Sequence, residues 1–306
     1  MAAVTLAESG HLVTPDDDLT RPTGHLRLRT GFDRWIGRLL PLLFIVAIFP
    51  ILDLVYYVSS RAIPSLSWTV LSSTSPTATD ALGVPIISTV EIMVLATAFS
   101  LLFGLFGGVA TAELLSERAA EWVRASANML AGAPSVIVGA FGYFAFVIYF
   151  GWGLSFIAGV LTLSFFMTPY VFRTVDLAFA SIPRPIREAA LGSGARPVQY
   201  ILRVGTPIAF PQILTGVFLA MAIGVGETAP LVLTTSVGKL LPQTLQSPVS
   251  FLTGFIWINF SQPNGSPLQI LAFQAAFILM LVVVGLNIVV RVISARYRKR
   301  LEGLYQ

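Results

Sequence analysis

The sequence contains no cysteine and only two histidines in its 306 residues. The absence of cysteine excludes disulfides, thiol catalysis and thiolate metal sites. The histidines, His11 and His25, both lie in the polar first thirty residues, so no histidine of an apolar segment can hold a haem or a metal ion. The nucleotide-binding sequence G-x-x-x-x-G-K-[ST] is also missing, because the Gly238-Lys239 pair is followed by Leu240. We therefore expect a chain that is not an enzyme and that binds no cofactor or metal.

Charged residues are scarce and segregated. They make up 11% of the chain, against 55% hydrophobic residues, whereas a soluble domain carries about 25% charged residues. No Lys, Arg, Asp or Glu occurs from Ala125 to Phe172 or from Leu240 to Val290. A helix of about 20 apolar residues crosses a bilayer, and both stretches are longer. The composition predicts an all-α membrane protein in contact with lipid. The basic residues gather at the ends of apolar runs, so the net charge of +4 does not indicate nucleic-acid binding.

Six apolar runs are expected to cross the membrane as helices. The run from Met129 to Tyr170 is too long for one span, and Gly151-Trp152-Gly153 divides it in two. Residues 251–260, between Pro248 and Pro263, are too few to cross, so we expect an interfacial helix or a re-entrant segment there. The expected spans are residues 39–58, 86–112, 129–150, 154–172, 208–235 and 271–291.

The distribution of Lys and Arg predicts the orientation, because these residues concentrate in cytoplasmic loops. Six spans place both termini on one side, together with 17 of the 19 basic residues. We therefore expect cytoplasmic N- and C-termini in a multi-pass cell-membrane protein. The N-terminal tail, residues 1–34, has too little apolar surface to fold alone and lacks the apolar region of a signal peptide, so we expect it to be disordered. The transmembrane domain is expected over residues 35–295 and a cytoplasmic C-terminal tail over 296–306.

A polar stretch between the fourth and fifth spans is the most informative part of the chain. It contains Glu188-Ala189-Ala190, then Gly194, and later Pro207. The prolines that precede it suit a helix start, and glycine accepts the left-handed conformation at a helix end. We expect a short helix, a turn at Gly194, a second helix, and a further turn at Pro207 into the fifth span. Glu188 is expected to face the base of this loop.

The same stretch resembles the EAA loop of the permease subunits of ABC importers. Glu188, Ala189, Ala190, Gly194 and Pro207 match that pattern. Two positions differ from the usual Ile and Leu, and they are occupied here by Val204 and Thr206. The resemblance implies a MetI-like permease with a cytoplasmic coupling helix, in which the five matching residues receive force from a separate ATPase subunit.

A second string, Gly226-Glu227-Thr228-Ala229-Pro230, lies in the fifth span. It resembles the signature of the PstA family, the permease subunits of bacterial phosphate importers, and residues 131–139 resemble the third span of that family. Many members carry Arg where this chain has Ile223. The resemblance implies inorganic phosphate import across the inner membrane. It also implies four partners: a PstC-like second permease subunit, two PstB-like ATPase subunits and an extracytoplasmic PstS-like phosphate-binding protein.

Glu227 is an acidic residue deep in an expected span. A charged group at the bilayer centre costs about 2.5–3.5 kcal/mol on insertion scales, so it is a functional candidate. We assign Glu227 and Thr228 to a substrate pathway or gate, in which Glu227 would pair with a basic residue of the second permease subunit. In the alternative, Glu227 only forms a hydrogen bond between packed helices beside Pro230.

Three other functions remain open at the level of the sequence. A permease for another oxyanion or an organic solute would carry the same loop. An ion channel or secondary transporter would not need the loop, and proton coupling usually needs several buried carboxylates or histidines. A membrane enzyme would need a catalytic set that the sequence does not contain.

Overall fold

The computed structural model describes residues 24–74, 81–235 and 241–302, and it consists of two units, residues 1–57 and 58–306. The first unit contains most of helix α1 (Gly24–Ala62), which carries Pro41 and Pro50 within it. The helix begins well before the expected boundary at residue 35, because extending a formed helix adds one hydrogen bond for each residue that is ordered. Residues 24–34 of the expected tail are therefore helical, and residues 1–23 lie outside the described part of the chain.

The second unit is a bundle of helices in which no strand occurs among the described residues. Its long helices are α3 (Gly83–Glu113), α6 (Phe156–Ala180), α9 (Thr206–Val225) and α12 (Pro267–Glu302). Helix α12 extends into the expected C-terminal tail, of which residues 303–306 are not described. The shorter elements are η1 (Ile63–Ser65), α2 (Trp68–Ser72), α4 (Glu117–Ala131), α5 (Ser135–Gly142), the π-helical η2 (Tyr143–Tyr149), α7 (Arg184–Gly192), α8 (Pro197–Tyr200), the π-helical η3 (Ile201–Gly205), α10 (Ala229–Thr234) and α11 (Leu252–Asn259).

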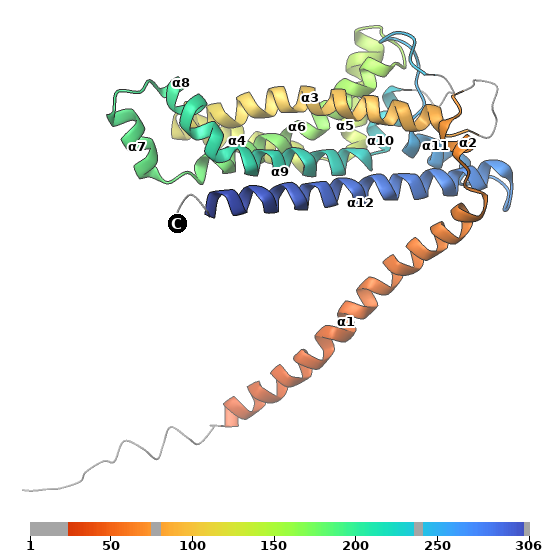
Figure 1. The fold of residues 1–306 in the computed structure, drawn as a ribbon, viewed down its shortest axis with the longest axis horizontal. Helices are drawn as coiled ribbons and strands as arrows, with labels where there is room; N and C mark the ends of the chain where they lie inside the picture. Colours follow the sequence, from red (N-terminus) through yellow and green to blue (C-terminus); the bar gives the residue numbers. More distant parts are fainter. Residues whose placement is uncertain (1–23, 75–80, 236–240, 303–306) are drawn as a thin grey trace, which may run out of the picture. The chain divides into compact units, whose positions relative to one another are not determined.

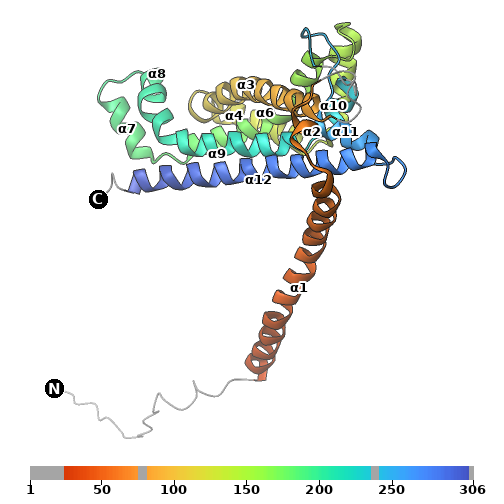
Figure 2. The ribbon, with the colours of Figure 1, turned by 45° about the vertical axis from the view of Figure 1, so that its right-hand side comes forward.

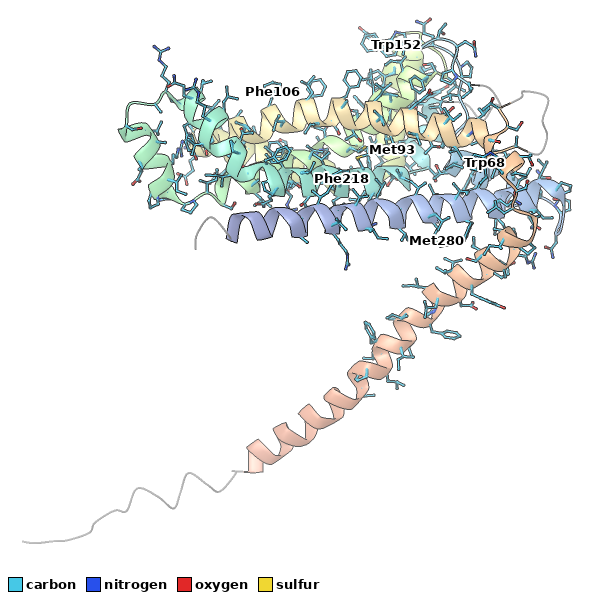
Figure 3. All side chains as sticks on the ribbon, in the orientation of Figure 1. Trp68, Met93, Phe106, Trp152, Phe218 and Met280 are labelled. Carbon is cyan, nitrogen blue, oxygen red and sulfur yellow. The ribbon has the colours of Figure 1, made fainter. Side chains whose placement is uncertain are left out.

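Helix α6 is the centre of the bundle, because α3, α5, α9 and α10 all pack against it. Its buried side chains include Leu163, Met167 and Val171, and Met93 of α3 joins the same core. Met93 therefore points into the bundle, whereas Phe106 on the same helix is exposed and points away from it (Figure 3). Large exposed apolar side chains on the outer faces are expected where a helix meets lipid rather than water.

The two ends of the bundle differ in what they carry. Figures 1 and 2 both show α7, α8 and the C-terminal end of α12 at one end. The same views show α2, α10 and α11 toward the opposite end. The loop that joins the fourth and fifth spans therefore lies at the end where the last helix finishes, as expected for a six-span chain.

The expected spans are present with two changes. Among the described residues, five helices are long and apolar enough to cross a membrane, and a sixth span results if α4 and α5–η2 are counted as one. These two segments meet at an angle of 98°, so the expected third span, 129–150, is not a straight helix. The expected fifth span, 208–235, is interrupted between Val225 and Ala229. The expected short segment 251–260 is present as α11, residues Leu252–Asn259.

Candidate coupling loop and translocation site

The loop between α6 and α9 forms two short helices, as its prolines and glycines predict. Helix α7 follows Pro183 and has a further proline in its first turn, where a missing N–H removes no helical hydrogen bond. It ends in a turn in which Gly194 has a φ of +89°. The N–H of Gly194 donates to the carbonyl of Leu191 at 3.0 Å, and the N–H of Ala195 donates to that of Ala190 at 3.3 Å. The turn expected at Gly194 is therefore present.

The second helix of the loop differs from the expectation at its end. Helix α8 begins at Pro197, and the backbone N–H of Arg196 donates to Oε1 of Gln199 at 2.8 Å. It then continues through η3 into α9, so residues Pro197–Val225 form one helical span. Pro207 does not mark a turn, because it lies inside this span, directly after the π-helical η3. The expected turn at Pro207 is wrong, and the base of the fifth span continues directly from α8.

The two sides of α7 have different surroundings. Ile186 and Ala190 are partly buried and pack against the core. Glu188 and Ala189 are exposed, and among the described residues Glu188 forms no hydrogen bond or ion pair. The expectation that Glu188 faces the base of the loop is therefore wrong. The residue that faces the bundle is Arg187, whose Nη2 lies 3.0 Å from Oε2 of Glu113 at the end of α3.

The second candidate site lies at the break between α9 and α10. The N–H groups of Gly226 and Glu227 donate to the carbonyls of Ile223 and Gly224, both at 3.1 Å, and close α9. Helix α10 starts after Thr228, whose carbonyl accepts from the N–H of Val232 at 2.9 Å. Glu227 and Thr228 thus lie together in non-helical backbone rather than within a continuous helix. Broken helices at membrane depth are found where backbone lines a cavity or is buried in protein.

A second broken helix meets the first one at this place. The half-buried side chain of Glu227 lies next to Ser135, the first residue of α5. Helix α5 approaches α10 so closely that a Cβ added at Gly139 would lie 3.0 Å from the carbonyl oxygen of Ala229. Helix α11 contacts the same place, because Oγ1 of Thr253 donates to the backbone carbonyl of Glu227 at 2.9 Å. The site therefore joins the α4/α5 bend, the α9/α10 break and the start of α11.

This site contains a carboxylate and hydroxyl groups, without a basic partner for Glu227 among the described residues. Glu227 alone would repel an anion, whereas Thr228 and Ser135 can donate hydrogen bonds to one. Sequence reasoning assigned Glu227 and Thr228 to one site and missed Ser135. The signal for Ser135 was present in Gly132 and Pro134, which interrupt an apolar run just as Gly226 and Pro230 do.

A further ion pair connects α4 with the central helix α6. Arg124 donates from Nε to Oδ2 of Asp176 and from Nη2 to Oδ1, both at 2.8 Å. The side chain of Asp176 is 8% exposed and that of Arg124 is 39% exposed. A two-pronged contact between guanidinium and carboxylate fixes orientation as well as distance. This ion pair therefore holds the amphipathic helix α4 against the end of α6.

Residues 100–299 contain the loop and both broken helices, and they match the family of binding-protein-dependent transport system inner membrane components. The chain belongs to this family. It is 34% identical over 257 residues to the "Phosphate transport system permease protein PstA 2" of Mycobacterium bovis, which covers 83% of this chain and 85% of the relative. It is 30% identical over 254 residues to the "Phosphate transport system permease protein PstA" of Haemophilus influenzae, which covers 81% of this chain and 88% of the relative.

The fold agrees with this family. The MetNI methionine ABC transporter in an inward-facing conformation has a chain with a TM-score of 0.57 at 18% identity, covering 69% of this chain and 95% of that one. A bacterial ABC transporter that imports the acidic polysaccharide alginate gives a TM-score of 0.55 at 16% identity, covering 87% of this chain and 98% of that one. The expected all-α, MetI-like permease architecture is confirmed. As an ABC-importer permease, this multi-pass membrane protein works with an ATPase and a binding protein.

Proposed function

We propose that this chain is a permease subunit of an ATP-driven importer of inorganic phosphate. The observation that carries the proposal is the exposed face of α7, with Glu188 and Ala189 at the end of the bundle and a fixed turn at Gly194. Such a short, projecting helix suits insertion into a groove of a partner. The PstA relatives named above support phosphate as the transported anion.

The chain supplies half of a transport pathway in this proposal. It pairs with a PstC-like permease subunit, and two PstB-like ATPase subunits bind the coupling loops from the cytoplasm. A PstS-like protein delivers phosphate on the outer side. Both termini of this chain are cytoplasmic in this proposal, since six spans put them on one side together with 17 of the 19 basic residues.

The ATPase acts on the pathway by moving the coupling loop. Glu188, Ala189 and Ala190 lie on α7, Gly194 forms its turn, and Pro207 lies in the helix that carries the motion into the membrane. Because α8, η3 and α9 are continuous, a tilt of the loop displaces the break that ends α9. ATP hydrolysis itself takes place on the partner, since no nucleotide-binding sequence exists in this chain.

Glu227 and Thr228 lie at the part of the pathway that changes between states. Glu227 pairs with a basic residue of the second permease subunit in one state and with Ser135 in the other. The pair closes the pathway when formed, and its opening exposes a positive charge that attracts phosphate. Thr228 then supplies a hydroxyl donor next to this point. Ligands move such an equilibrium only by binding one state better than the other.

Reconstitution tests this function directly. The two permease subunits and the ATPase are placed in liposomes with ATP on the side of the ATPase, and uptake of radiolabelled phosphate is measured with and without the binding protein. Uptake should require ATP and the binding protein, and a large excess of sulfate or molybdate should not compete. If sulfate or molybdate is taken up and phosphate is not, the chain belongs to an importer for another oxyanion and the phosphate assignment is wrong.

A further inference from the structure

A polar cluster below the coupling helix connects three separate elements. Nη2 of Arg187 in α7 lies 3.0 Å from Oε2 of Glu113 and donates to the backbone carbonyl of Glu113 at 3.2 Å. Glu113 is the last residue of α3. The carboxylate of Glu113 also lies next to the side chain of Tyr200 in α8. We call Arg187, Glu113 and Tyr200 the loop-base cluster.

Two side chains of the loop-base cluster are buried, so they depend on contacts within the cluster rather than on water. The side chain of Glu113 is 5% exposed and Tyr200 is 2% exposed, whereas the side chain of Arg187 is 43% exposed. A buried carboxylate is stable in its charged form only when it is paired and hydrogen-bonded. Oε2 of Glu113 accepts no aligned hydrogen bond, so the proximity of the Arg187 charge has to compensate for its burial. Glu113 therefore cannot replace this interaction from solvent, so its burial favours the position of Arg187 at the end of α3.

The coupling helix has few other attachments. It spans nine residues, Arg184–Gly192, and a helix of this length is not stable without tertiary contacts. Its apolar attachments are the partly buried Ile186 and Ala190. Apolar contacts are non-directional, so they allow sliding and tilting. The hydrogen bond from Nη2 of Arg187 to the carbonyl of Glu113, with the carboxylate 3.0 Å away, restrains both movements. The orientation of α7 is thus set mainly by Arg187.

Helix α3, which carries Glu113 of the loop-base cluster, is tightly packed into the core. A Cβ added at Gly104 or Gly108 of α3 would lie 2.7 Å from Val171 or Val175 of α6. Two helices at this separation move together, because any sliding produces overlap between backbone and side chains. A displacement of Glu113 along α3 is therefore passed to α6, and α6 packs against α5 and α10 on either side of Glu227.

We propose that Arg187 is a positioning residue that fixes the coupling helix to α3 through Glu113 and Tyr200, so that the ATPase moves α3 together with α7. The inference rests on the proposed function and adds a second connection by which movement of the ATPase reaches the break at Glu227. The route through α8 and α9 is covalent, whereas this one depends on an ion pair. Without the ion pair, α7 can follow the ATPase while α3 stays behind, and ATP is then hydrolysed without transport.

Two measurements on the full complex test this proposal. The first is the number of ATP molecules hydrolysed for each phosphate imported by liposomes. Arg187→Gln and Glu113→Gln should each raise this ratio by about tenfold, and Tyr200→Phe should raise it less because the ion pair remains. The double variant should be no worse than either single one, since residues that act as a unit are non-additive. Arg184→Gln is the matched control, because Arg184 is an exposed arginine of the same helix, and its ratio should equal that of the parent.

The second measurement does not depend on the transported substrate. The chain has no cysteine, so spin labels can be attached through Ser193→Cys beside α7 and Leu115→Cys beside the end of α3. The distance distribution between them should be narrow in the parent and in Arg184→Gln, and broad in Arg187→Gln. A distribution in Arg187→Gln that matches the parent overturns the inference, as does an unchanged ATP-to-phosphate ratio. Failure of the parent complex to import phosphate while the distance result holds refutes the proposed function and leaves the positioning role intact.

Discussion

Replacing Gly194 by alanine isolates the contribution of one backbone angle to coupling. The φ of Gly194 is +89°, and nothing lies within 4 Å of a Cβ added there. The substitution therefore produces no clash, and its whole effect comes from forcing an L-residue into the left-handed region, at about 1–2 kcal/mol. This corresponds to a factor of about 5–30 in the population of the native turn.

The turn determines where α7 ends and where α8 begins. If docking of the ATPase requires the native turn, its apparent affinity decreases by the same factor of about 5–30. Gly192 provides a matched control, because a Cβ added there is also in open space and its φ is not positive. Gly192→Ala lies within the helix and should stabilise it by up to about 1 kcal/mol. Gly194→Pro should be the most severe of the three, because proline cannot adopt a positive φ.

The assay titrates the purified ATPase against the permease in lipid nanodiscs and measures binding and phosphate uptake for each variant. Gly194→Ala should weaken binding, Gly192→Ala should not, and Gly194→Pro should abolish uptake with the protein still in the membrane. If Gly194→Ala and Gly192→Ala give the same affinity and the same uptake, the left-handed turn is irrelevant to docking and the reasoning fails.

Three further predictions concern other parts of the molecule. Glu227→Gln should strongly reduce phosphate uptake without dissociating the complex, because it removes the charge and keeps the shape; full activity of this variant together with loss in Glu227→Ala would mean that Glu227 serves packing only. A single cysteine at Ser193 should be inaccessible to a membrane-impermeant label in intact cells, and one at Ser261 should be labelled; the reverse pattern would invert the topology. Asp176→Asn should lower the free energy of unfolding by about 1–3 kcal/mol, less than for a fully buried pair because Arg124 is 39% exposed. Thermal unfolding in detergent measures this, and an unchanged midpoint would show that the ion pair contributes nothing to stability.

The coupling loop was predictable from the sequence because its information is local. Proline and glycine determine backbone conformation at their own positions, so the start of α7 and the turn at Gly194 follow from residue types alone. The absence of a turn at Pro207 was not predictable in the same way. Proline is frequent in turns, but it is also found inside helices at kinks and π-helical segments, and the residue types alone do not decide between the two.

The cluster formed by Arg187, Glu113 and Tyr200 shows what local reasoning misses. Glu113 is 74 positions from Arg187 in the sequence, and no spacing rule connects them. Arg187 is also the direct neighbour of Glu188, which matches the EAA pattern. Of these two residues, the sequence favoured Glu188 as the one that faces the bundle, and the structure shows that it is Arg187. Which side of a short helix is buried depends on the surface that it meets, and a nine-residue helix carries too few apolar positions to determine it.

The sequence by itself determined that this is an all-α membrane protein with a short helix and a turn at Gly194 between two of its long helices. Apolar length, the segregation of Lys and Arg and the order of glycines and prolines along the chain are sufficient for that, because the bilayer imposes helix length and backbone satisfaction on every segment. Only the tertiary structure decided that Glu227 lies in a break and faces Ser135, and that the α4/α5 and α9/α10 interruptions meet. These contacts join residues far apart in the chain, and they follow from close packing of the helices, which no single segment specifies.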